Sequence, residues 1–251
     1  MSEQIPAAPR NWRSPEELVA IGFERSRVVM MNEAHAGFLR SIRTREVGRR
    51  ILPAAHDAGV RHLAMEALVP QFAADANATR TFSEVPGGYV SQPEMRMLME
   101  AALTLGWTLI PYEVRERWPS SIDPMSMEGA NWRDGHQAHN LLTAMRTLRE
   151  DAPLLVWCGN HHLAKMSLGG WRPLRVRFAE LSGIEPFSID QIASVEFPGQ
   201  VPVAAPWVAA YGYVLAAYGG AAGFLAEDAP EGWLSPDSAD AFVIANENAM
   251  T

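Results

Sequence analysis

The sequence predicts an α/β fold in which a mostly parallel central sheet is flanked by helices. Short apolar runs alternate with segments of helical periodicity over the first 160 residues, and this alternation is typical of parallel strands joined by crossover helices. The chain has 251 residues, 48% of them hydrophobic, so it can bury one large core. We therefore expect an N-terminal arm and short helix over 1–26 and a single α/β domain over 27–251, whose part from about 190 completes or covers the sheet.

Helix starts and stops are marked by capping residues. Ser14-Pro15-Glu16-Glu17 combines a serine N-cap, a proline at the first helical position and acids in the first turn, and this helix ends before Ser26. A long helix over about 36–58 carries a rough apolar stripe and has Gly59 as its C-cap. Two further helices are expected over 91–105 and 132–150.

Short apolar runs mark the strands. The predicted strands are 27–31, 62–65, 107–110, 153–157, 187–189 and 241–244. Residues 70–90 and 115–129 are predicted to be loops, and both are long enough to close over a ligand. Residues 201–225 are rich in Ala, Gly, Val and Tyr but are interrupted by prolines and a Gly-Gly pair, which favours a buried loop-and-helix segment over a membrane span.

Composition limits the classes of partner. The formal net charge is −8, which argues against a broad nucleic-acid surface or an anionic-membrane surface. Cys158 is the single cysteine, so no internal disulfide can form. The N-terminus has no apolar signal-peptide region. We expect a cytoplasmic protein with a small-molecule substrate, no nucleic-acid or membrane partner, and an oligomeric state left open.

Polar residues follow four of the predicted strands. Because the carboxyl ends of parallel strands meet at one edge of a sheet, these residues are expected to form one composite site. A carboxylate that is partly buried at such an edge can act as an acid or base with a raised pKa. The residues, in chain order, are Glu33 with His35, Glu66, Glu113, and Asn160 with His162.

The helix over 132–150 adds a polar line to this site. Asn131 is its expected N-cap, with Asp134 at the third helical position. Arg133 and the residues four and seven positions later, Gln137 and Asn140, share one helical face. Arg133 suits an anionic group or a developing oxyanion, although an exposed polar face is the simpler reading.

Several common catalytic motifs are absent. The sequence has no His-Glu-x-x-His, no Cys-x-x-Cys, no glycine-rich phosphate loop and no Gly-x-Ser-x-Gly elbow, which disfavours a structural zinc site and a serine-triad hydrolase. Cys158 follows a strand core and is expected to be a buried small hydrophobe. His161 and His162 point to different sides of an extended chain, so one of the two is expected to face the site.

The order of these motifs resembles the erythromycin esterase-like family, within a wider group that includes ChaN-like haem-uptake proteins and Tiki-like proteins. That family has Gly-Glu-x-x-His after its first strand, Glu after its second, an Arg-Asp-x-x-Met-Ala-x-Asn helix, and a Trp-Ala-His-Asn-x-His strand end. Here Glu33 and His35 are one residue closer, Gln137 stands at the Met position, and Gly159 stands at a His position. The resemblance covers roughly residues 27–190.

The resemblance implies hydrolysis of an ester or amide bond by activated water, with no cofactor. His35 would be the general base, and Glu33 and Glu66 would orient it or hold the water. His162 and Arg133 would bind the carbonyl side. Residues expected to contact the substrate are Asn160, Glu113, Asn140 and His161.

Three alternatives stay open. In Tiki-like peptidases a similar site binds a divalent metal, and its ligands here would be Glu33, His35 and His162. A ChaN-like protein would bind haem instead, with Tyr112, Met125 and Met127 as nearby candidate ligands. A third reading is an interaction scaffold whose apolar partner surface comprises Trp207, Tyr211, Tyr213 and Tyr218.

Overall fold

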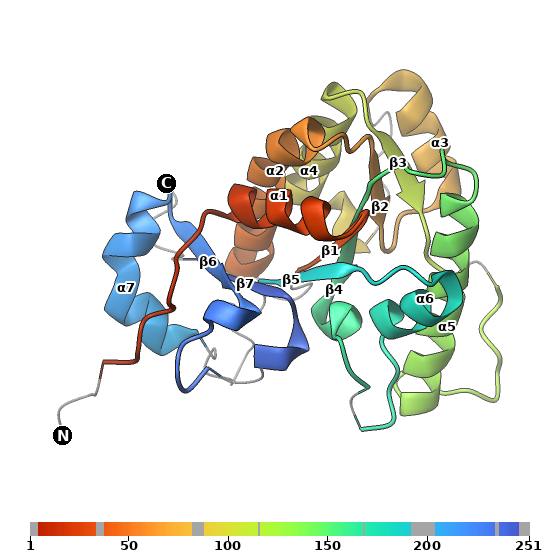
Figure 1. The fold of residues 1–251 in the computed structure, drawn as a ribbon. Coiled ribbons are helices and arrows are strands. Elements are labelled where there is room, and N and C mark those ends of the chain that lie inside the picture. Colours follow the sequence, from red (N-terminus) through yellow and green to blue (C-terminus); the bar gives the residue numbers. More distant parts are fainter. Residues whose placement is uncertain are drawn as a thin grey trace.

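A seven-stranded sheet forms the centre of the computed structural model (Figure 1). The structure describes residues 5–33, 38–81, 88–114, 116–167, 169–191, 204–233 and 236–245, with the backbone alone at 38–41, 88–89, 160–161 and 236. The strands are β1 (Val28–Glu33), β2 (His62–Met65), β3 (Thr108–Pro111), β4 (Leu154–Gly159), β5 (Phe187–Asp190), β6 (Ala221–Leu225) and β7 (Ala241–Ala245).

The strand order is β3-β2-β4-β1-β5-β7-β6. Every neighbouring pair is parallel except β6 and β7, which are antiparallel. The predicted α/β class with a mostly parallel sheet is therefore confirmed. All residues of the central strands β1 and β4 are buried, as expected of strands that are covered on both faces.

Helices cover both faces of this sheet (Figure 1). One face packs against α1 (Pro15–Arg25), α2 (Phe38–Asp57), α3 (Pro70–Thr79) and α4 (Pro93–Thr104). The other face packs against α5 (Met127–Met145), α6 (Leu174–Ser182) and α7 (Ala205–Ala217). Side chains of β1 alternate between these faces, so that Met31 lies with α2 while Met30 lies with α5.

The predicted start of α1 and the predicted ends of α2 and α4 agree with the local geometry. The Ser14 hydroxyl accepts a 3.1 Å bond from the Glu17 amide, and the Glu17 carboxylate accepts a 2.6 Å bond from the Ser14 amide, which completes a capping box. Gly59 and Gly106 follow α2 and α4 with φ of 91° and 82°, the left-handed conformation that ends helices.

Two predicted loops are shorter than expected. Residues 70–90 contain α3, which begins at Pro70, and a short 3-10 turn over Gly88–Ser91; residues 82–87 lie outside the described residues. The predicted loop over 115–129 is shortened because the helix predicted over 132–150 begins at Met127 and ends at Met145. The N-cap of this helix is Ser126, whose hydroxyl accepts a 3.0 Å hydrogen bond from the Gly129 amide. Asn131 is therefore inside the helix and not its cap.

The segment 201–225 contains α7 and a strand, β6, that the sequence did not indicate. The N-terminal arm lies along it, since Trp207 donates to the Ala7 carbonyl at 2.8 Å and Tyr211 to the Pro6 carbonyl at 2.6 Å. The Tyr218 hydroxyl likewise donates to the Trp12 carbonyl at 3.2 Å. Three of the four aromatic residues proposed as a partner surface thus hold the chain's own arm. None of the described helices is long and apolar enough to span a membrane.

A glycine in α2 lets the helix approach the sheet closely. A Cβ at Gly48 would lie 2.4 Å from the Trp157 ring, so we expect Gly48→Ala to lower the free energy of unfolding by about 1–3 kcal/mol. Gly135 in α5 is a matched control, since its nearest atom would be 3.5 Å away, and Gly135→Ala should raise stability by about 0.5–1 kcal/mol. Urea denaturation measures both, and equal effects would contradict the packing argument.

Candidate functional site

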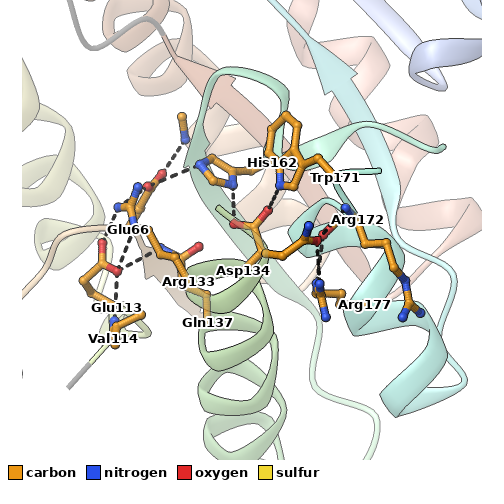
Figure 2. A network of polar contacts seen from close by, with 12 residues as sticks. Glu66, Glu113, Val114, Arg133, Asp134, Gln137, His162, Trp171, Arg172 and Arg177 are labelled. Atoms are coloured by element: carbon orange, nitrogen blue, oxygen red, sulfur yellow. Dashed lines mark hydrogen bonds and ion pairs between the residues drawn. The ribbon is translucent and has the colours of Figure 1, made fainter. Parts of the chain in front are cut away.

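Three neighbouring strand ends and the first half of α5 bring a polar network together (Figure 2). Glu66 follows β2, and Glu113 follows β3. His162 lies in the 3-10 turn over Asn160–Leu163 that continues β4. Because β3, β2 and β4 are adjacent and parallel, their carboxyl ends converge at one edge, as predicted.

Arg133 of α5 joins the two glutamates. Its Nη2 atom lies 2.5 Å from Glu66 Oε1 and 2.5 Å from Glu113 Oε2. The second Glu66 oxygen accepts the Gly159 amide at 2.6 Å. The Glu66 side chain is 1% exposed, whereas those of Arg133 and Glu113 are 32% and 25% exposed. The network therefore has a buried carboxylate at its base and a half-buried cation above it.

The polar line on α5 contacts the residues that follow β3. Gln137 donates to Glu113 Oε1 at 3.0 Å. Asn140 donates to the backbone carbonyl of Glu113 at 3.0 Å. Arg133, Gln137 and Asn140 thus share one face, as their spacing predicted, and this face holds the Glu113 segment in place.

His162 lies between two carboxylates. Its Nδ1 is 2.7 Å from Asp134 Oδ1, and its Nε2 is 3.6 Å from Glu66 Oε1. The other Asp134 oxygen accepts the Trp171 indole N–H at 2.6 Å, and the Trp171 ring stands edge-on to the imidazole. Asp134 is fully buried. The His162 ring is consequently fixed in orientation by its neighbours.

The electrostatic surroundings favour the protonated form of His162. Burial of the ring lowers its pKa, but the Glu66 and Asp134 carboxylates raise it by more, so that the pKa lies above its ordinary value. A protonated imidazole donates hydrogen bonds from both nitrogens. His162 is therefore suited to stabilising negative charge or donating a proton.

Glu33 is buried in a different set of contacts, on the face of the sheet that α2 covers. Arg45 donates to the Glu33 carboxylate at 2.7 Å from Nε and at 3.2 Å from Nη2. The Trp157 indole donates to it at 3.0 Å. Both charged side chains of the pair are 0% exposed. These partners of Glu33, Arg45 and the Trp157 indole, lie outside the Glu66–His162 network.

Other predicted site residues lie partly or wholly outside the described residues. His35 is outside them, and only the backbone of Asn160 and His161 is described. The described residues contain no group of three or more His, Cys, Asp or Glu side chains arranged to hold a metal ion. Cys158 is fully buried, and burial raises its pKa well above the ordinary thiol value.

Sequence reasoning missed two parts of this site. Asp134 was assigned to helix capping, but its position directly after Arg133 places it about 100° around the helix, which turns it toward His162. Trp171 belongs to the irregular segment before α6. No local pattern marks it, because its contact with Asp134 depends on tertiary packing.

Comparison with known proteins identifies the fold. No family model matches the chain, and neither does any curated protein sequence. Among solved structures, ChaN of Campylobacter jejuni, which binds haem cofacially, is similar with a TM-score of 0.53 at 8% identity over 94% of this chain and 96% of that one. This likeness shows that the two proteins share a fold.

Two effector structures are also similar. RRSP, a MARTX toxin effector domain from Vibrio vulnificus CMCP6, gives a TM-score of 0.49 at 12% identity over 70% of this chain and 35% of that one. The type III effector HopBA1 gives 0.45 at 14% identity, over 75% and 87%. The chain spans about a third of the MARTX effector structure that it matches.

Proposed function

We propose that this protein is a hydrolase that cleaves an ester or amide bond with an activated water molecule. The observation that carries the proposal is the placement of His162, held by Asp134 at 2.7 Å and near Glu66 at 3.6 Å, beside the Arg133 guanidinium. A buried acid–base network at the carboxyl edge of a parallel sheet is a common arrangement for catalysis. The motif order resembling the erythromycin esterase-like family is consistent with it.

The roles follow from charge and burial. Protonated His162 would stabilise the oxyanion or donate a proton to the leaving group, and Asp134 would orient it. Glu66 would position the water, with Arg133 balancing its charge. His35 is proposed as the general base. The side chains of Asn160 and His161 are proposed to contact the substrate, while Glu113 and Asn140 support Arg133 and its surroundings.

Glu33 does not fit the role of a metal ligand. Its carboxylate is already bonded to Arg45 and Trp157, and a metal would have to displace both. We therefore propose a reaction that proceeds through the side chains alone, and hydrolysis in the presence of a chelator tests this point within the assay below.

The test is hydrolysis of 4-nitrophenyl esters and 4-nitroanilides by the full chain. We expect His162→Gln and Glu66→Gln each to lower kcat/KM by about 10²–10⁴-fold, the usual contribution of acid–base groups. His136→Gln is the matched control, because His136 lies on α5 but faces Glu116 at 3.3 Å, outside the network; its activity should stay within about twofold. Equal activity of all variants would contradict the proposal.

Haem binding is a second candidate function, favoured by the likeness to ChaN over 94% of the chain. Of the three candidate ligands, Tyr112 does not favour it, because its buried hydroxyl donates to the Trp157 carbonyl at 2.8 Å. Met125 and Met127 are 91% and 48% exposed. A Soret shift at stoichiometric haem would support haem binding. If no shift is seen, haem binding is ruled out and the hydrolase proposal stands.

A further inference from the structure

A pocket of about 340 Å³ lies between the C-terminal ends of α5 and α6, two helices that pack against each other (Figure 1). Arg27, which lines the pocket, directly precedes β1, and Glu150 lies in the segment that leads into β4. The pocket is therefore at the edge where these parallel strands begin, opposite the edge that carries Glu66 and His162. Its volume falls in the range of about 300–1,000 Å³ that is usual for small-molecule sites.

The wall of this pocket is mainly apolar. Five hydrophobic side chains from the last turns of the two helices and the segments after them line it: Leu142, Met145, Leu148, Leu181 and Ile184. Leu181 is 51% exposed, so a ligand can reach the wall from solvent. Met145 is 8% exposed and belongs to the core on this face of the sheet. A bound aliphatic group would remove part of this apolar surface from water, which favours binding.

Two guanidinium groups and one carboxylate belong to the same lining, on Arg27, Arg146 and Glu150. Arg27 donates to the backbone carbonyl of Glu150. Among the described residues, no carboxylate forms an ion pair with Arg27 or Arg146, whereas the nearby Arg149 pairs with Asp151. The lining thus carries two positive charges against one negative charge, in a chain whose formal net charge is −8.

The helix ends beside the pocket could disfavour an anion, because the last carbonyls of a helix carry partial negative charge. Here the Leu142 carbonyl of α5 accepts the Arg146 amide at 3.1 Å. The Phe178 carbonyl of α6 accepts the Ser182 hydroxyl at 2.7 Å. These end carbonyls are paired within the chain, so the guanidinium groups decide which charge the pocket prefers.

We propose that this pocket binds a small amphipathic carboxylate, such as a medium-chain fatty acid. The aliphatic tail lies against the apolar wall, and the carboxylate pairs with the guanidinium of Arg146, whose planar set of N–H donors matches two oxygen atoms. Because Glu150 adds a negative charge nearby, a ligand with one negative charge suits the pocket better than a dianion. The inference is independent of the proposed hydrolysis, since no residue of the polar network lines this pocket.

The test is a titration of the full chain, labelled with ¹³C at the methionine methyl groups, with octanoate, octanol and acetate. The Met145 signal is assigned by its loss in Met145→Leu. We expect octanoate to shift this signal saturably and to bind about tenfold more tightly than octanol, which lacks the charge. Acetate, which lacks the tail, should give no saturable shift. Met125 is an internal control, since it is 91% exposed and lies at the other end of α5, and its signal should not move.

Arg146→Gln tests the charged contact. It should weaken octanoate binding about tenfold while octanol binding stays within about twofold. Arg149→Gln is the matched control, because Arg149 is exposed, pairs with Asp151 and does not line this pocket; its octanoate affinity should stay within about twofold.

Three results would each overturn the proposal. The first is the lack of a saturable shift of the Met145 signal with octanoate. The second is equal affinity for octanoate and octanol, and the third is an octanoate affinity that Arg146→Gln leaves unchanged. All three are binding measurements, so none of them depends on the outcome of the hydrolysis assay.

Discussion

Replacing Arg45 with methionine is expected to lower the free energy of unfolding by about 3–5 kcal/mol, because it leaves an uncompensated buried carboxylate. Arg45 and Glu33 are both fully buried, and two hydrogen bonds join them. The Arg45 guanidinium also bonds to Gln92 of the segment before α4. Urea denaturation at neutral pH measures the loss.

The matched control is an arginine–glutamate pair of the same length at the surface. Arg96 Nε lies 2.7 Å from Glu100 Oε1 in α4, with the side chains 40% and 37% exposed. Arg96→Met should lower the free energy of unfolding by less than about 1 kcal/mol, since solvent screens exposed pairs. If Arg45→Met lowered the free energy of unfolding by no more than Arg96→Met does, the stabilising role assigned to the Arg45–Glu33 pair would be contradicted.

The strands that the sequence predicted are those with continuous apolar runs. β1 and β4 are covered on both faces, and the first four residues of each, Val28–Met31 and Leu154–Trp157, are apolar. β6 was not predicted, because Ala221, Ala222 and Gly223 have little strand preference of their own. Its pairing with β7 and with Arg13 of the N-terminal arm stabilises it, and both partners are distant in sequence.

The convergence of Glu66, Glu113 and His162 could be predicted because it depends on topology alone: the carboxyl ends of parallel neighbours share an edge. The separation of Glu33 could not be predicted in the same way. Strand side chains alternate between faces, and Glu33 lies on the same face as Met31 and Trp157. Its partner, Arg45, belongs to the following helix, where it resembles the other arginines in sequence.

Asp134 was missed because a helix boundary was misplaced. With Asn131 as the cap, Asp134 would sit in the first turn and bond to backbone amides. The true cap, Ser126, places Asp134 in the middle of the helix, where the backbone amides are already paired. A carboxylate there must find a tertiary partner, and it finds His162 and Trp171.

Replacing Asp134 with asparagine is therefore expected to lower the pKa of His162 and to reduce hydrolysis by about 10²–10⁴-fold. The substitution keeps the size of the side chain but removes a charge that favours the imidazolium. Titration of the His162 ring by NMR measures the pKa, and the kinetic assay measures the loss. Asp240→Asn is the control, since Asp240 bonds to Lys165 and Ser188 and should leave the pKa of His162 unchanged.

The same substitution should change how stability depends on pH. The pKa of His162 is raised in the folded state, so the folded protein binds more protons than the unfolded chain between the unfolded pKa of about 6.5 and the folded value. This contribution to stability is fully present below about pH 6.5 and is lost as the pH rises through the folded pKa. Urea denaturation across this range should show a decline in the wild-type protein that Asp134→Asn reduces and Asp240→Asn retains. An unchanged decline in Asp134→Asn would show that Asp134 does not hold the proton on His162.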